Sequence, residues 1–263
     1  MLNIIVCIKQ VPDTKEVKID PDKGTLIREG VPSILNPDDR NALEEALRIK
    51  DKNLNTNVKV ITMGPPQAEE VLVEALSMGA DEGILLCDKA FAGADTWATS
   101  NTLAKAIEKI GDYDLIFCGN QAIDGDTAQV GPQLAERLGL PQVTYVNEFD
   151  LKDETVTVKR SLEDGYETIE VKKPALFTII EEINTPRYLY IDKIFEAYEK
   201  NNIQVWSNDE LNIESSKLGL DGSPTQVKRT FTPEKEKEGE IIEGPPEEQA
   251  KTLLAKLKNK NVI

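Results

Sequence analysis

The segment GNQAIDGDTAQVGPQLAERLG, at positions 119–139, has the residue types of a ligand-binding loop. It follows the apolar run 115–118, passes two carboxylates at Asp124 and Asp126, and enters a helical pattern. A similar turn, GADT at 93–96, precedes another helical pattern, and its counterpart in the first segment is GDTA at 125–128. We expect both turns at the carboxyl ends of strands, where open α/β sheets bind their ligands.

The chemistry of these turns favours a nucleotide held by the backbone. Neither GxGxxG nor GxxxxGK[ST] occurs, so the usual dinucleotide and P-loop motifs are absent. Helix N-termini bind phosphate through their amide groups, and three are predicted, at Asn36-Pro37, Asp95-Thr96 and Asp126-Thr127. Because a carboxylate would repel a pyrophosphate, we expect Asp126 to cap its own helix and leave the Thr127 hydroxyl for the ligand. The alternative is that these acids are plain helix caps, with no ligand.

Composition excludes several kinds of chemistry. There is no histidine, which removes the commonest general base and imidazole metal sites. The three cysteines form no CxxC pair and lie in apolar runs, so we interpret them as buried hydrophobes. The DGD sequence has too few acids for an EF-hand calcium loop. The protein is therefore expected to perform no acid–base catalysis of its own.

The net charge of −16 argues against nucleic acid and anionic membranes as partners. No run of about 18 apolar residues is present, so no membrane insertion is expected. The N-terminal sequence MLNIIVCIKQV is interpreted as a strand and not as a signal peptide. These features predict a cytoplasmic protein.

Strand and helix patterns alternate through the first half of the chain. Apolar runs predict buried strands at 4–8, 58–63, 84–86, 115–118 and 175–180. Helical patterns lie between them, and the one that begins at Asn36-Pro37 has a capping residue followed by proline. This alternation predicts a doubly wound, mostly parallel, Rossmann-like sheet. A hairpin excursion with its turn at 21–24 is also expected.

The pattern changes after Pro141. Segments 144–146, 155–159 and 168–171 predict an antiparallel addition at the sheet edge, and beyond Glu181 no βα unit is recognisable. An amphipathic segment surrounds Ile191, a charged linker spans 232–244, and a last amphipathic helix begins near Pro246. We therefore expect an α/β domain at 1–183, an irregular docking segment at 184–231, and an extended C-terminal arm at 232–263.

These residues resemble a known family. The segment GNQAIDGDTAQVGPQLAERLG, with NPDDRNALEEAL, ITMGPPQAEEVLVEALSMGAD and NTPRYL, is similar to the β subunit of electron-transferring flavoproteins over nearly the whole chain. The resemblance implies an adenine-nucleotide-hydrolase-like sheet and a heterodimer with an α subunit that carries FAD. Ordinary members hold AMP in the β subunit, whereas the electron-bifurcating branch holds a second FAD there, which accepts hydride from NADH.

The motifs carry a nucleotide pocket over to this chain. Both GDTAQVGP and FAGADTWAT resemble the bifurcating branch, and the small residues at 92–94 would let a flat ring approach the backbone. The implied pocket comprises Cys7, Asn36, Pro37, Asp38, Asp39, Met63, Phe91, Ala92, Gly93, Ala94, Asp95, Thr96, Thr99, Gly119, Asn120, Gln121, Ala122, Asp124, Gly125, Asp126, Thr127, Ala128, Gln129 and Val130.

The resemblance also implies partners. A dehydrogenase, expected to be of the acyl-CoA type, would dock on an apolar anchor that falls on Ile191, although nearby acids replace the family's basic cluster. NADH would reduce the FAD, which would pass electrons to ferredoxin or flavodoxin and, through the α subunit, to the dehydrogenase. Two alternatives remain: a one-flavin subunit holding AMP, and a stand-alone regulator resembling the universal stress proteins.

Overall fold

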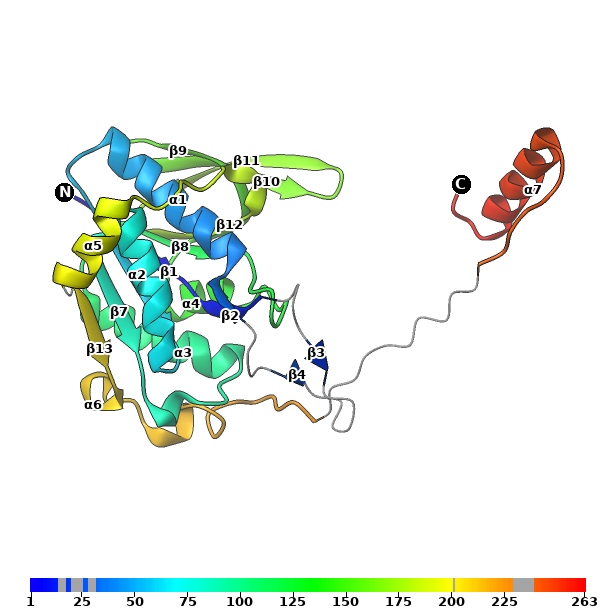
Figure 1. Cartoon of the computed structure of the whole chain (residues 1–263). Helices are drawn as coiled ribbons and strands as arrows, with labels where there is room; N and C mark the ends of the chain where they lie inside the picture. Colours follow the sequence, from blue (N-terminus) through cyan, green and yellow to red (C-terminus); the bar gives the residue numbers. More distant parts are fainter. Residues whose placement is uncertain (14–17, 20–25, 28–31, 201, 229–238) are drawn as a thin grey trace. The chain divides into compact units, whose positions relative to one another are not determined.

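The computed structural model describes residues 1–13, 18–19, 26–27, 32–200, 202–228 and 239–263. The chain divides into two compact units, Met1–Lys228 and Arg229–Ile263. The first unit contains the sheet (Figure 1). In the second unit, the described residues form one helix, α7 (Pro246–Asn259), in which no residue is buried.

A nine-stranded sheet organises the first unit. In spatial order its strands are β11 (Gly165–Lys172), β10 (Thr155–Leu162), β9 (Gln142–Leu151), β12 (Ala175–Ile179), β8 (Leu115–Gly119), β1 (Leu2–Cys7), β6 (Thr56–Met63), β7 (Glu82–Leu86) and β13 (Ile203–Trp206). From β9 to β13 all neighbours are parallel, whereas β9, β10 and β11 pair antiparallel. The hairpin β10–β11 continues the sheet at one edge (Figure 1).

Helices cover both faces of the sheet because the central strands are apolar on both sides. Ile4 and Val6 of β1 belong to one core cluster, whereas Ile5 and Cys7 belong to the other. The first cluster includes the apolar side chains of α1 and α2, and α5 packs on α2. The second includes those of α3, α4 and α6. These helices are α1 (Pro37–Lys52), α2 (Glu69–Met78), α3 (Thr96–Ile110), α4 (Val130–Leu138), α5 (Ile191–Lys200) and α6 (Asn208–Leu211).

The strand order reverses beside β1. The chain passes from β1 to β6 and β7 on one side, and then returns to place β8 on the other. Cys7, the last residue of β1, is level with Cys118 of β8. Sheets of this kind bind ligands at such a reversal, outside the carboxyl ends of the strands.

The predicted fold class, including the antiparallel edge addition, is confirmed. Part of the expected hairpin excursion is present as β3 (Lys18–Ile19) paired with β4 (Leu26–Ile27), but its turn at 21–24 lies outside the described residues. A second short pair joins β2 (Gln10–Pro12) to β5 (Ser33–Leu35). The absence of any further βα unit beyond Glu181 was a wrong prediction, because β13 extends the sheet beside β7 after helix α5.

Candidate functional site

The loop 119–129 is fastened to the start of α1 across the reversal point. Asn36 is fully buried; its Nδ2 donates to the Gln121 carbonyl oxygen at 2.8 Å, and its Oδ1 accepts from the Ile123 N–H at 3.1 Å. The amide therefore pairs with the loop backbone much as a neighbouring strand would. The expected capping role is wrong, since Asn36 precedes Pro37 but makes no side-chain cap. Its function is to hold the loop.

Asp39 fastens the two strand ends to each other. Its buried carboxylate accepts from the Lys9 N–H, just beyond β1, and from the Gly119 N–H at the end of β8, both at 2.9 Å. Both are backbone contacts, so Asp39 supports the site and is itself held away from solvent. Asp38 is half-buried and accepts from the Gln121 N–H at 3.3 Å. The pKa of Asp38 is raised above its usual value, mainly because the carboxyl is partly buried.

Burial also raises the pKa of Asp39 to about 7, against the hydrogen bonds from Gly119, Lys9 and Asn36, which lower it. Because the folded-state pKa lies above the unfolded value, the protonated form is favoured by folding. The contribution of protonated Asp39 to the free energy of unfolding is therefore complete below about pH 4 and is lost as the pH rises through about 7.

Asp39→Asn removes this titration. As the pH rises from 4 to 8, the wild type should lose free energy of unfolding that the variant keeps. The difference between variant and wild type should therefore increase by on the order of 4 kcal/mol, for a shift of about three pKa units. Urea unfolding of both chains across that range measures the difference. A difference that stays constant with pH would show that Asp39 is ionised throughout. Asp114→Asn, which removes another carboxylate bonded to a strand amide, is the control.

The 119–129 loop combines a fixed base with an exposed tip. Lys9 Nζ forms an ion pair with Asp124 at 2.7 Å, which anchors one acid of the loop. Asp126 and Ala128 have positive φ angles of 48° and 51°, a strained conformation for residues with a side chain. Strain of this kind is retained where the local backbone serves a function.

Three consecutive backbone amides are free at this tip. Within the described part of the chain, the N–H groups of Thr127, Ala128 and Gln129 donate to no protein acceptor, nor does the exposed Thr127 hydroxyl. They directly precede α4, whose N-cap is Gln129. The prediction that Asp126 caps this helix is wrong, since α4 begins at Val130. Pro132 falls in its first turn, where no helical hydrogen bond is lost.

The start of α3 lies against the start of α4. Asp95 caps α3 by accepting from the Ala98 N–H at 3.0 Å. The Thr96 hydroxyl donates to Gln129 Oε1 at 3.0 Å. Two helix N-termini, each with a partial positive charge, therefore meet beside the three free amides. This arrangement suits a diphosphate.

A segment that the sequence did not single out supports the 93–96 turn from behind. The Asp95 N–H donates to Ser223 Oγ at 2.8 Å, and Asp95 Oδ2 accepts from both the N–H and the hydroxyl of Thr225 at 3.0 and 2.7 Å. Leu220 N–H also donates to the Ala92 carbonyl oxygen at 3.0 Å. Burial raises the pKa of Asp95, but the bonds from Thr225 and Ala98 outweigh it and lower the pKa overall. Only the three-dimensional structure could reveal this pairing across more than a hundred residues.

The structure brings most of the predicted pocket residues to this edge, with different exposure. Ala92, Gly93, Asp124, Gly125, Asp126, Thr127 and Gln129 are exposed. Pro37, Asp38, Met63, Ala94, Asp95, Thr96, Thr99, Asn120, Gln121, Ala122, Ala128 and Val130 are half-buried. Cys7, Asn36, Asp39, Phe91 and Gly119 are buried, which favours supporting roles for these residues. A hydrogen bond with Cys7, and then burial, raises the pKa of the Cys118 thiol, so Cys118 is not a reactive thiol.

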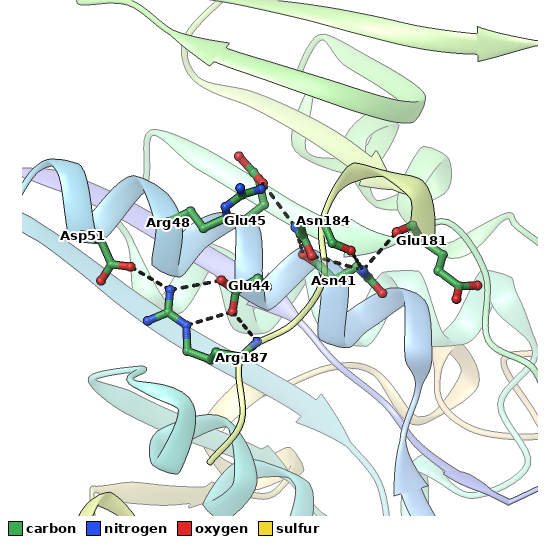
Figure 2. A network of polar contacts seen from close by, with 8 residues as sticks. All are labelled: Asn41, Glu44, Glu45, Arg48, Asp51, Glu181, Asn184 and Arg187. Atoms are coloured by element: carbon green, nitrogen blue, oxygen red, sulfur yellow. Dashed lines mark hydrogen bonds and ion pairs between the residues drawn. The ribbon is translucent and has the colours of Figure 1, made fainter. Parts of the chain in front are cut away.

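A polar network fixes the segment before α5 to α1 (Figure 2). Arg187 donates to Glu44 at 2.8 and 3.1 Å and to Asp51 at 2.7 Å. Asn41 Nδ2 donates to the carbonyl oxygen and side chain of Asn184 at 2.8 and 3.1 Å. The ALEEA and NTPR motifs thus form one structural unit, and their charged residues bind each other. Burial lowers the pKa of Arg187, but the bonds to Glu44 and Asp51 raise it overall.

The chain beyond Arg187 presents a cluster of exposed apolar side chains. Ile191, the predicted anchor, is 74% exposed at the start of α5, and Tyr188 is 94% exposed. A hollow of about 450 Å³ lies beside them, lined by Leu47, Leu54 and Tyr190 among others. This exposed cluster, which we name the docking patch after the role predicted for Ile191, comprises Tyr188, Leu189, Tyr190, Ile191, Phe195 and Tyr198.

A metal-binding cluster and a membrane-spanning helix are both absent from the described ranges. No cluster of three or more cysteine and acidic side chains there could hold a metal ion. Among the same residues, no helix is long and apolar enough to cross a membrane.

A doubly wound, mostly parallel sheet with helices on both faces defines an α/β protein of the Rossmann-like class. Residues 23–211 match the electron transfer flavoprotein domain. The chain is 58% identical over its full length to the electron transfer flavoprotein subunit beta of Thermoanaerobacterium thermosaccharolyticum and 56% identical to that of Clostridium acetobutylicum, covering 100% of both chains in each case. It is also 56% identical to the caffeyl-CoA reductase-Etf complex subunit CarD of Acetobacterium woodii, again over 100% of both. The chain belongs to the electron transfer flavoprotein family and is of the β-subunit type.

Proposed function

We propose that this chain is the FAD-binding β subunit of an electron-bifurcating electron transfer flavoprotein. The observation that carries the proposal is the set of three free amides at 127–129 beside the paired starts of α3 and α4. An FAD bound there would accept hydride from NADH and give up its electrons singly, to ferredoxin or flavodoxin and to the FAD of the α subunit.

The residues of the site divide into those that bind and those that support. The amides of Thr127, Ala128 and Gln129 and the Thr127 hydroxyl would donate to the diphosphate. The exposed residues Ala92 and Gly93 leave open the surface on which the flat ring system would lie. None of these groups is a general base, which is consistent with hydride transfer to a flavin, because that step needs no side-chain base.

A second candidate keeps the complex but places AMP in the site. The three amides and the Thr127 hydroxyl could serve the oxygens of one phosphate as well as those of a diphosphate. The dinucleotide is favoured instead by the exposed small residues Ala92 and Gly93, because AMP has no second ring system to lie on them. A stand-alone regulator is disfavoured, because Leu253 and Leu254 of α7 remain half exposed in their own unit and call for a partner surface.

The test of this function is an anaerobic titration of the purified heterodimer with NADH. Bleaching of flavin absorbance near 450 nm, beyond the amount the α-subunit FAD accounts for, is the expected result (roughly double the one-flavin value). No reduction of flavin by NADH would overturn the proposal.

The same proposal assigns roles to the remaining segments. The docking patch within 184–231 would bind the dehydrogenase, and the arm at 232–263 would bind the α subunit, in a cytoplasmic complex. A caffeyl-CoA reductase occurs in the name of one close relative, which favours a dehydrogenase of the acyl-CoA type.

Ile191→Glu should weaken docking to the dehydrogenase by roughly tenfold or more, because a charge replaces an apolar anchor. Electron transfer from the NADH-reduced heterodimer to an acyl-CoA dehydrogenase of the same organism measures the effect. Flavin reduction by NADH should be unchanged. Leu162→Glu, at another exposed apolar position, is the matched control. Equal loss in both variants would contradict the assignment of Ile191.

A further inference from the structure

Arg137, near the end of α4, joins that helix to the first turns of α3. Its Nε donates to Ser100 Oγ at 2.9 Å, its Nη2 to the Trp97 carbonyl oxygen at 2.9 Å, and its Nη1 to Asn101 Oδ1 at 3.2 Å. The guanidinium carbon also lies 4.1 Å from the centre of the Trp97 ring. All three nitrogens are used, in a fork that a lysine cannot reproduce.

Gln133, one turn earlier on α4, continues the same line of contacts toward the site. Its Nε2 donates to Thr96 Oγ1 at 3.2 Å, and its Oε1 accepts from Ser100 Oγ at 3.3 Å. Thr96 in turn donates to Gln129, next to the free amides. A continuous row of polar contacts therefore joins the two helices, from Arg137 to the N-terminus of α4.

Two electrostatic features suggest that these contacts between α3 and α4 position the site. Aligned helices whose N-termini are level place like poles side by side, which is unfavourable without a counter-interaction. Within the described part of the chain, moreover, Arg137 forms no ion pair, whereas Lys9 at the other side of the loop is neutralised by Asp124. An arginine without a carboxylate partner is notable in a chain of net charge −16.

We propose that Arg137 is a positioning residue of the nucleotide site: through Ser100, Asn101 and Trp97 it holds the starts of α3 and α4 level, so that both reach the diphosphate of one ligand. The inference rests on the proposed function for the identity of that ligand. It adds a residue outside the expected pocket, contributed by the opposite end of α4.

The test compares Arg137→Gln and Arg137→Lys with the wild type in the full heterodimer. After removal of bound nucleotide, FAD binding to this subunit is titrated, and the reduction potential of the bound flavin is measured. Arg137→Gln should weaken binding by roughly tenfold, as loss of charge-assisted hydrogen bonds predicts, and should shift the potential. Arg137→Lys should recover less than half of the loss, because it keeps the charge but not the fork.

Lys105→Gln is the matched control, since it removes an exposed cation from α3 whose partner is Glu108 on the same helix. Asn101→Ala removes a single acceptor and is expected to weaken binding by about threefold, which keeps the test decisive if Arg137→Gln does not fold. Binding within twofold of the wild type and an unshifted potential in Arg137→Gln would overturn the inference, even if the unfolding temperature falls. If the wild type binds AMP and not FAD, the proposed function fails, but the same comparison made with AMP still tests Arg137.

Discussion

Gly119→Ala should remove the flavin from this subunit and lower the stability of the fold. A Cβ added at Gly119 would lie 2.3 Å from Asp39 Oδ1, 2.6 Å from the Asp39 nitrogen and 2.7 Å from the Asp38 carbonyl carbon. Two of these three atoms belong to the backbone of α1, so the helix start and the strand end must separate. The bond from the Gly119 N–H to Asp39 would be lost with them. A cost of about 1–3 kcal/mol in the free energy of unfolding follows.

Gly239→Ala is the control for this variant. It lies outside the predicted pocket, and its added Cβ would meet no atom within 4 Å. Chemical denaturation and the flavin content of the purified heterodimer measure both effects. Full flavin content in Gly119→Ala would contradict the role given to the contact between α1 and β8.

Thr127→Trp should deplete the FAD of this subunit and leave the FAD of the α subunit in place. The side chain is exposed at the tip of the loop, beside the free amides, so an indole there would occupy the space required by the diphosphate. Because the residue is exposed and its hydroxyl bonds to no described residue, the fold itself should tolerate the change. We expect roughly a tenfold or greater loss of affinity.

Thr168→Trp places the same bulk on the exposed face of β11 and serves as the control. Flavin released by acid and quantified by chromatography distinguishes the two variants. An unchanged flavin content in Thr127→Trp would exclude the 127–129 amides as the binding groups.

Sequence patterns predicted the central architecture because it depends on local signals. Apolar runs such as the one ending at Cys118 mark strands buried on both faces, and capping residues such as Asp95 mark helix starts. The edge strand β13 was missed because it is only four residues long and its exposed side chains include Gln204 and Val205. Because Gln204 and Val205 are adjacent, they lie on opposite faces of the strand, and an edge strand that is exposed on both faces gives only a weak hydrophobic pattern.

The site was less predictable because its contacts link distant parts of the chain. Local rules assign Asn36 and Asp126 to helix caps, yet Asn36 binds the 121–123 backbone instead. Asp126 adopts a left-handed conformation four residues before α4 begins. The hydrogen bonds from Thr225 to Asp95 join residues 130 positions apart, which no local pattern can indicate.

The ALEEA and NTPR motifs show the difference between recognising a motif and explaining it. As sequence they mark the family, whereas in the structure Glu44 and Arg187 bind each other and hold the segment that precedes the docking patch on α1 (Figure 2). Their partly buried ion pair costs desolvation, so it contributes more to geometry than to stability. The patch could therefore change to suit another partner while this support stays the same.

A second flavin, bound by this subunit, is the central requirement of the proposed function, and counting flavins tests it most directly. The heterodimer, purified with its α subunit, is denatured in acid, and released FAD and AMP are quantified against protein. Two FAD molecules per heterodimer and no AMP are the expected result. One FAD together with one AMP would contradict it.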